Sequence, residues 1–221
     1  MGDLTAGLFA TIGIAAALFD RTKTGRGMKV DVGMLDSQVA ILENAIARYV
    51  ATSDVPGPIG SRHPSIAPFA AFATNDGHVV IAVATETLFA KLCEALGSPE
   101  LATDARYASN PLRMKHWEEL HQDMEVALSA HDARYWLHKL EAAGVPCAPL
   151  NNVADVVADP QVNSRNMIVT ANDPDIGPLK MQGNPIKLSA YEDPTTRTHA
   201  PDLDADRVAI LKWLGLEKPS P

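Results

Sequence analysis

The sequence is poor in cysteine and has no cluster of metal-ligating residues. Only two cysteines occur in 221 residues, and neither Cys93 nor Cys147 has a histidine or a second cysteine beside it. We therefore expect two reduced, buried thiols. Histidines that share a predicted helix lack the four-residue spacing of a helical zinc site, so no metal site is predicted. These pairs are His116 with His121 and His131 with His138.

Positive charge is also scarce. The chain has 19 lysines and arginines against 27 aspartates and glutamates, a net charge of −8, and no basic block. This balance argues against a nucleic-acid partner and against attraction to an anionic membrane surface. A hydrophobic share of 46% and a charged share of 21% are typical of a soluble, cytoplasmic protein that buries one or two modest cores.

The chain lacks a nucleotide-binding glycine loop and a typical membrane-spanning run. The charge-free segment of residues 4–19 has 16 residues, including two threonines and two glycines, whereas a span needs about 20 apolar residues. Asp3 precedes it, where a signal peptide would carry basic residues. We predict a helix without a membrane role, on which another element packs closely along a stripe of small residues. The stripe consists of Gly7, Ala10, Gly13 and Ala17.

Asp3 stands at the start of this apolar helix. A carboxylate there is expected to cap the first backbone N–H groups, and the helix dipole would keep it ionised with a lowered pKa. An ionised carboxylate with an apolar flank can attack an acyl carbon. From the residues alone, Asp3 is therefore either an ordinary capping residue or a nucleophile.

Short segments that cover nearly the whole chain resemble, in their order, the class III CoA-transferase family, the group of the formyl-CoA and carnitine-CoA transferases. Each segment alone is a weak signal, but together they make the resemblance specific. The segments are residues 2–7, 21–27, 30–36, 62–69, 76–83, 143–150, 159–162 and 184–189.

The resemblance implies that Asp3 is the catalytic nucleophile. Family members carry a long N-terminal half before the matching aspartate, whereas only Met1 and Gly2 precede it here. That half supplies most of the CoA pocket, so we expect this chain to be a C-terminal portion. The expected fold is α/β: part of a Rossmann-like large domain plus a smaller α/β domain, from an intertwined dimer. The expected partner is a second copy or a complementary N-terminal chain.

A glycine-containing loop at residues 57–68 is the second candidate site. Two glycines would let the backbone approach a ligand, and several side chains offer hydrogen-bond donors to a carboxylate or thioester oxygen. From the residues alone, an ordinary linker is the alternative. The resemblance implies a mobile lid that shields the intermediate on Asp3 from water. The candidate residues are Gly57, Gly60, Ser61, Arg62, His63 and Ser65.

A basic turn follows the first helix. Arg26, with Arg21 and Lys23 just before it, could bind a phosphate of coenzyme A. A solvated turn is the alternative for at least two of these three side chains. Arg26 is the candidate cofactor-binding residue.

The remaining patterns predict alternating strands and helices. Strands are predicted at 28–32, 69–73, 78–84, 145–150, 167–170 and 179–182, with hairpins at residues 75–77 and 173–177. Helices are predicted at 36–50, 87–96, 110–130, 132–143, 153–158 and 205–214, with Asn110 as the cap of the helix at 110–130 and a frayed end at 217–221. Glycines and prolines between residues 52 and 60 mark a boundary. We predict a large-domain segment at 1–55, a small α/β domain at 56–177 and a return segment at 178–221.

The predicted function is CoA transfer between an acyl-CoA and a small carboxylic acid through an aspartyl-CoA thioester on Asp3. A dicarboxylic acid is favoured because the guanidinium fork of Arg62 could hold a second carboxylate. Coenzyme A enters as substrate, and no tightly bound cofactor is expected. One alternative is the family's α-methylacyl-CoA racemase activity, which the sequence Leu4-Thr5-Ala6-Gly7 makes less favoured. The other is an inactive remnant or one subunit of a split enzyme.

Overall fold

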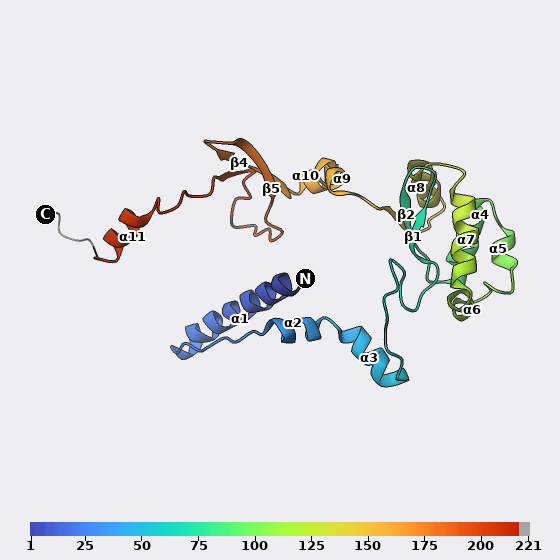
Figure 1. Ribbon diagram of the computed structural model, residues 1–221, viewed down its shortest axis with the longest axis horizontal. Helices are drawn as coiled ribbons and strands as arrows, with labels where there is room; N and C mark the ends of the chain where they lie inside the picture. The colour runs from blue at the N-terminus through green and yellow to red at the C-terminus, as the bar shows by residue number, and fades with distance from the viewer. Residues whose placement is uncertain (217–221) are drawn as a thin grey trace. The chain divides into compact units, whose positions relative to one another are not determined.

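The computed structural model describes residues 1–216, and Figure 1 shows their helices and strands. The chain divides into two compact units. The first runs from Met1 to Ser61, and the second begins at Arg62. Each unit is described by itself. Helices alternate with two small sheets, which confirms the predicted α/β class.

The first unit is helical, with α1 at Gly2–Thr24, α2 at Met34–Ala40 and α3 at Glu43–Thr52. Gly25 ends α1 in the left-handed conformation, with φ of 70°, which glycine adopts without a steric cost. A Cβ atom at Gly13 would lie 2.8 Å from Cγ1 of Val30, whereas nothing lies within 4 Å of a Cβ at Gly7. Val30, in the segment after α1, therefore packs closely on the small-residue stripe at Gly13, whereas no other atom of the described chain packs on the stripe at Gly7.

Two predictions for this unit are wrong. Residues 28–32 are extended but form no strand, because a strand needs a hydrogen-bonded neighbour and residues 1–216 supply none for this segment. The helix predicted at 36–50 is two helices. It breaks where Leu42 N–H donates to the carbonyl of Val39, three residues back, a tighter turn than the α-helical one.

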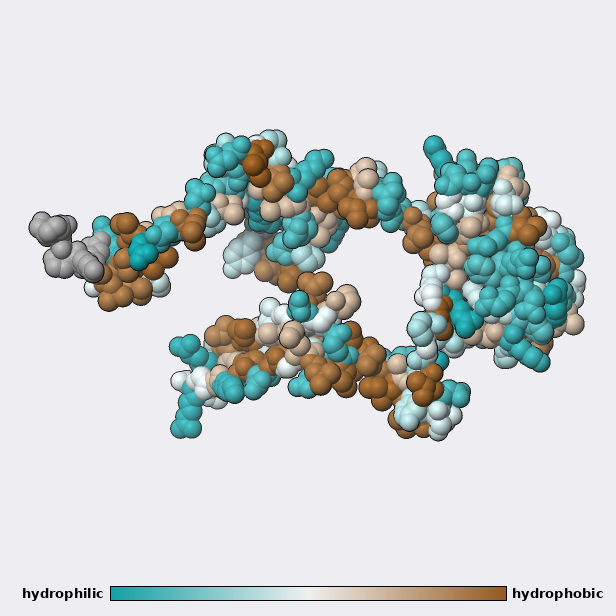
Figure 2. Space-filling model, viewed as in Figure 1, coloured by the Kyte–Doolittle hydropathy of each residue, from teal (hydrophilic) through white to brown (hydrophobic). Residues whose placement is uncertain are grey.

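α1 is largely exposed within the described chain. Of its 23 residues only Thr5 is buried, and Leu8, for example, is 66% exposed. Figure 2 shows apolar side chains gathered on the surface of this unit. By length and composition α1 could cross a membrane, although the core helices of soluble proteins and signal sequences share these properties.

The second unit is built around a three-stranded antiparallel sheet in the order β1-β2-β3. Its strands are β1 (Phe69–Ala73), β2 (His78–Ala82) and β3 (Cys147–Pro149). The hairpin predicted at residues 75–77 is confirmed, since Thr74 N–H donates to the carbonyl of Gly77 at its base. Alternate side chains of β1 and β2 are buried, which gives the sheet one apolar face.

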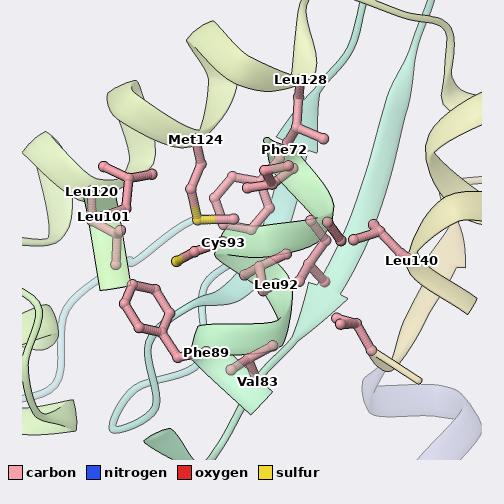
Figure 3. Close-up of a cluster of buried hydrophobic side chains, with 14 of the residues drawn as sticks. Phe72, Val83, Phe89, Leu92, Cys93, Leu101, Leu120, Met124, Leu128 and Leu140 are labelled. Atoms are coloured by element: carbon pink, nitrogen blue, oxygen red, sulfur yellow. The ribbon is translucent and has the colours of Figure 1, made fainter. Parts of the chain in front are cut away.

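Helices cover this face and complete the core. They are α4 (Glu86–Leu96), α5 (Glu100–Thr103), α6 (Asn110–Lys115), α7 (Trp117–Leu128) and α8 (Ala133–Ala142). Figure 3 shows Phe72 of β1 with Leu92 of α4 and Met124 of α7 in the same cluster of buried side chains. The helix predicted at 110–130 is two helices, α6 and α7. They meet at His116, whose φ of −105° and ψ of 38° are not helical. α5 was not predicted.

A second sheet has the order β5-β4-β6, with β4 at Ile168–Asp173, β5 at Gly177–Gln182 and β6 at Thr196–Thr198. The β4–β5 hairpin is confirmed. β6 pairs with β4 in parallel and was not predicted. The helices of this region are α9 (Val153–Ala158), α10 (Pro160–Ser164) and α11 (Arg207–Trp213).

The three-part division of the chain stays a prediction. Its boundary between residues 177 and 178 falls inside the β4–β5 hairpin, so a division there would cut a hydrogen-bonded pair of strands. The predicted frayed end at 217–221 lies outside the described residues.

Candidate active site

Asp3 is the second residue of α1 and is exposed to solvent. The prediction that it caps the helix is wrong, because the chain already turns helical at Gly2 and the cap position falls on Met1, which makes no side-chain capping bond. The Asp3 carboxylate has no hydrogen-bond or ion-pair partner within residues 1–216. A free carboxylate thus sits in the first turn, where unpaired N–H groups and the helix dipole favour negative charge.

The turn that carries Asp3 is fixed by Thr5 and Gln38, which the sequence analysis missed. The Thr5 hydroxyl is buried, 3.0 Å from the carbonyl oxygens of both Met1 and Gly2. It accepts a hydrogen bond of 2.7 Å from Nε2 of Gln38, a residue of α2. The only signal in the sequence is that Thr5 is one of two threonines in a run without charges. Through this bond, α2 holds the first turn of α1 in place.

The candidate loop is divided between the two units. Gly57, Gly60 and Ser61 end the first unit, and Arg62, His63 and Ser65 begin the second. Gly60 has φ of 66°, a value that side chains with a Cβ rarely adopt. A Cβ atom at Gly57 or at Gly60 would meet nothing within 4 Å. The open glycine segment is consistent with a loop that approaches a ligand.

The basic end of the loop lies against the second unit. The guanidinium carbon of Arg62 is 5.7 Å from the centre of the Trp117 ring. The ring of His63 stacks on that of Phe69, with 5.2 Å between centres and 8° between planes. The backbone N–H of His63 also donates to the carbonyl of Phe69. The mobile lid stays a prediction. Within the second unit, Arg62 contacts Trp117 and His63 contacts Phe69.

Two residues of α6 hold the loop where it enters β1. Asn110 Nδ2 donates to the carbonyl of Ser65, and Asn110 Oδ1 accepts from the N–H of Ala67, both at 2.9 Å. Arg113 Nε donates to the carbonyl of Ala67. Asn110 was expected to cap the helix, but Ser109 occupies the cap position and the Asn110 side chain binds the loop. The Asn-Pro pair resembles a helix start, which hid this role.

Arg26 is exposed, and its side chain has no hydrogen-bond or ion-pair partner in the described part of the chain. Arg21 lines a groove of about 320 Å³ between α1 and residues 27–30, with otherwise apolar walls. Arg26 remains the predicted phosphate-binding residue. Arg21, which the sequence analysis named beside it, lines this groove.

The potential metal ligands and the two cysteines were also compared with their predictions. Among residues 1–216, no three His, Cys, Asp or Glu side chains are grouped so that they could hold a metal ion. Both cysteines are free. Cys93 is buried as predicted, whereas Cys147 is only half-buried, because β3 is an edge strand of its sheet.

Comparison with known proteins assigns this chain to a family. The profile of CoA-transferase family III matches residues 1–207. The chain belongs to this family. It is 42% identical over 212 residues to the acetyl-CoA:oxalate CoA-transferase of Acetobacter aceti, covering 96% of this chain and 53% of that protein. It is 34% identical over 192 residues to the succinyl-CoA:glutarate CoA-transferase of Mus musculus, covering 87% and 44%.

A solved structure agrees with this assignment. A CAIB/BAIF family protein from Brucella suis superposes with a TM-score of 0.81 at 33% identity, covering 96% of this chain and 55% of the other. This CoA-transferase family III chain thus spans about half the length of the relatives it matches. The family resemblance seen in the sequence is confirmed.

Proposed function

We propose that the protein transfers coenzyme A from an acyl-CoA to a small dicarboxylic acid, with Asp3 as the covalent nucleophile. The observation that carries the proposal is the unpaired, exposed carboxylate of Asp3 in the first turn of a long apolar helix. A carboxylate committed to an ion pair or a cap bond would have to lose that partner before it could attack. Asp3 has none to lose within the described residues.

The chemistry uses one carboxylate and four exchanges. The Asp3 carboxylate attacks the acyl carbon of the donor, and the CoA thiolate leaves, giving a mixed anhydride. The thiolate then attacks the aspartyl carbonyl and releases the donor acid, leaving an aspartyl-CoA thioester. The acceptor carboxylate attacks this thioester and expels the thiolate, which finally attacks the acceptor's acyl carbon and frees Asp3. Each step exchanges one activated acyl bond for another, so no step needs an external energy source.

Water must be excluded during these steps, because hydrolysis of the anhydride or of the thioester is irreversible. We propose that the loop of residues 57–65 provides this exclusion. The open glycine segment before Arg62 would move, and the anchored residues after it would act as the fixed end of the lid.

The proposed acceptor class is the short dicarboxylic acids. The two relatives named above act on oxalate and glutarate, which carry two carboxylates each. In the described chain Arg62 has a ring contact but no ion pair, so its guanidinium fork is available to a second carboxylate.

We also propose that another protein chain covers α1 in the functional assembly. Apolar side chains such as Leu4, Leu8 and Ile12 are more than half exposed, and soluble proteins rarely leave a large apolar patch open to water. The cover would be a second copy or a chain corresponding to the rest of the relatives' length. Light scattering should report an oligomer or a complex, whereas a stable monodisperse monomer would count against this.

Asp3→Asn tests the proposed nucleophile. After incubation with an acyl-CoA, mass spectrometry should find coenzyme A bound to the peptide that contains Asp3, and the variant should lose both the adduct and turnover. Asp20→Asn, on the same helix, is the matched control and should keep both. Adduct formation in Asp3→Asn would remove Asp3 as nucleophile. Exchange of the substrate α-proton without acyl transfer would support a racemase instead. The intact Acetobacter aceti relative calibrates the adduct signal.

A further inference from the structure

His63 is held in one orientation by its neighbours. Its ring stacks on Phe69, and the backbone N–H of Ser65 donates to its Nδ1 at 3.2 Å. A backbone N–H can only donate, so Nδ1 must present a lone pair. The proton of the neutral imidazole ring is therefore on Nε2.

The Nε2–H group of His63 is an unused donor. No hydrogen bond to Nε2 occurs among residues 1–216, and the side chain is half-buried. A donor that is oriented by these two contacts but has no acceptor among residues 1–216 is suited to a ligand oxygen, because little ordering is needed when the ligand binds.

Asn110 sets the backbone that orients this ring. Its two hydrogen bonds fix the carbonyl of Ser65 and the N–H of Ala67. The peptide unit between Ser65 and Ile66 is thereby fixed relative to α6, although Asn110 is 45 positions away in the sequence. The N–H of Ser65 belongs to the peptide unit directly before it. Without this side chain, the chain that follows Ser65 would lose its anchor to α6, and the Ser65 N–H could then turn away from His63.

We infer that His63 donates a hydrogen bond from Nε2 to a carboxylate oxygen of the acid substrate, and that Asn110 is the positioning residue for this donor. The inference rests on the proposed function for its choice of ligand. Arg62, the preceding residue, would supply positive charge to a carboxylate of the acid substrate, while His63 would supply a neutral, directional donor. A role limited to packing on Phe69 is the competing explanation.

The protonation state of His63 can be measured without turnover. In the chain labelled with 15N-histidine, long-range proton–nitrogen correlations should show that Nδ1 of His63 is unprotonated at pH 8. Titration with glutarate or oxalate should then shift the Nε2 resonance of His63 but not that of His138, an exposed histidine of α8. A proton on Nδ1, or no shift at saturating acid, would overturn the inference.

Paired variants separate donation from packing. His63→Phe keeps an aromatic ring against Phe69 and removes the donor, whereas His63→Gln keeps an N–H donor on a non-aromatic side chain. Loss of one hydrogen bond to a charged group corresponds to about 10- to 100-fold. In an active preparation, His63→Phe should therefore raise KM for the acid by about that factor, and His63→Gln should recover most of it. A wild-type KM in His63→Phe would show a packing role only.

Asn110→Ala tests the positioning role. In this variant the His63 correlations should become those of two mixed tautomers, and the KM of the acid should rise while the KM of the acyl-CoA stays unchanged. An unchanged tautomer would remove Asn110 from the inference. Asp3→Asn should leave the glutarate-induced shift of His63 unaffected, so failure of the proposed nucleophile and failure of this site give different results.

Discussion

Arg113 donates a hydrogen bond of 2.6 Å from Nε to the carbonyl of Ala67, a residue 46 positions earlier in the chain. The guanidinium is completely buried, and its Nη1 donates to the carbonyl of Tyr107 at 3.0 Å. Burial lowers the pKa of Arg113, and the nearby carboxylate of Glu86, 3.6 Å from Nη2, opposes this effect. The cation also lies over the ring of Phe89. One side chain thus joins α6 to the entry of β1.

Arg113→Met should destabilise the second unit by about 3 kcal/mol, because it leaves two buried carbonyls without donors. Urea unfolding followed by tryptophan fluorescence measures this through Trp117 and Trp136, both in the core. Arg134→Met, an exposed arginine on α8 without a described partner, should change the stability by less than about 0.5 kcal/mol. Equal effects of the two substitutions would contradict the role assigned to Arg113.

Gly7→Ala and Gly13→Ala should differ although both glycines lie inside α1. Alanine is favoured over glycine in a helix by about 1 kcal/mol, which corresponds to about a 5-fold change in local opening. Gly7→Ala should slow amide exchange in α1 by about this factor, because its Cβ meets open space. Gly13→Ala should show no gain, since its Cβ would lie 2.8 Å from Val30.

The double variant Gly13→Ala, Val30→Ala tests the cause of this difference. Because the Val30 methyl groups are removed, amide exchange in α1 should be slower in the double variant than in Gly13→Ala alone. If Gly13→Ala alone slows exchange as much as Gly7→Ala, the close packing of residues 28–32 against α1 is wrong.

The two cysteines should react at different rates. Burial raises the pKa of Cys93 to about 12, and it also raises that of Cys147, which is half-buried. The thiolate is the reactive form, so a raised pKa slows alkylation. At pH 8 iodoacetamide should modify Cys147 slowly and Cys93 hardly at all, as peptide mass spectrometry would show.

Alkylation in urea provides the control for this prediction. The unfolded chain should react equally at both thiols, since both then have ordinary pKa values. Faster native labelling of Cys93 than of Cys147 would contradict the burial described for α4.

Elements specified by nearby residues could be predicted from the sequence. The β1–β2 hairpin follows from Asn75-Asp76-Gly77, and α4 ends at Gly97, whose φ is 77°. The prediction failed where the structure depends on distant residues. Residues 28–32 have the composition of a strand but no partner in the described chain, and β6 becomes a strand by pairing with β4, 26 positions away.

The candidate site shows the same division. Asp3 was found because a family resemblance covers its neighbourhood, and the loop was found because glycines mark it. Thr5, Gln38, Asn110 and Arg113 were missed, since each acts through a bond to another element. Asn110 even suggested a different role, because its neighbour Pro111 is typical of a helix start.

The parallel pairing of β6 with β4 has a consequence for how the chain can be shortened. β4 lies in the middle of its sheet only because Thr196–Thr198 occupies the side away from β5. A fragment that stops before Thr196 would leave the N–H and carbonyl groups on that side of β4 open to strands of other molecules. We therefore expect the stretch after the β4–β5 hairpin to protect the second unit against aggregation, so that a soluble version of this unit should extend beyond Thr198.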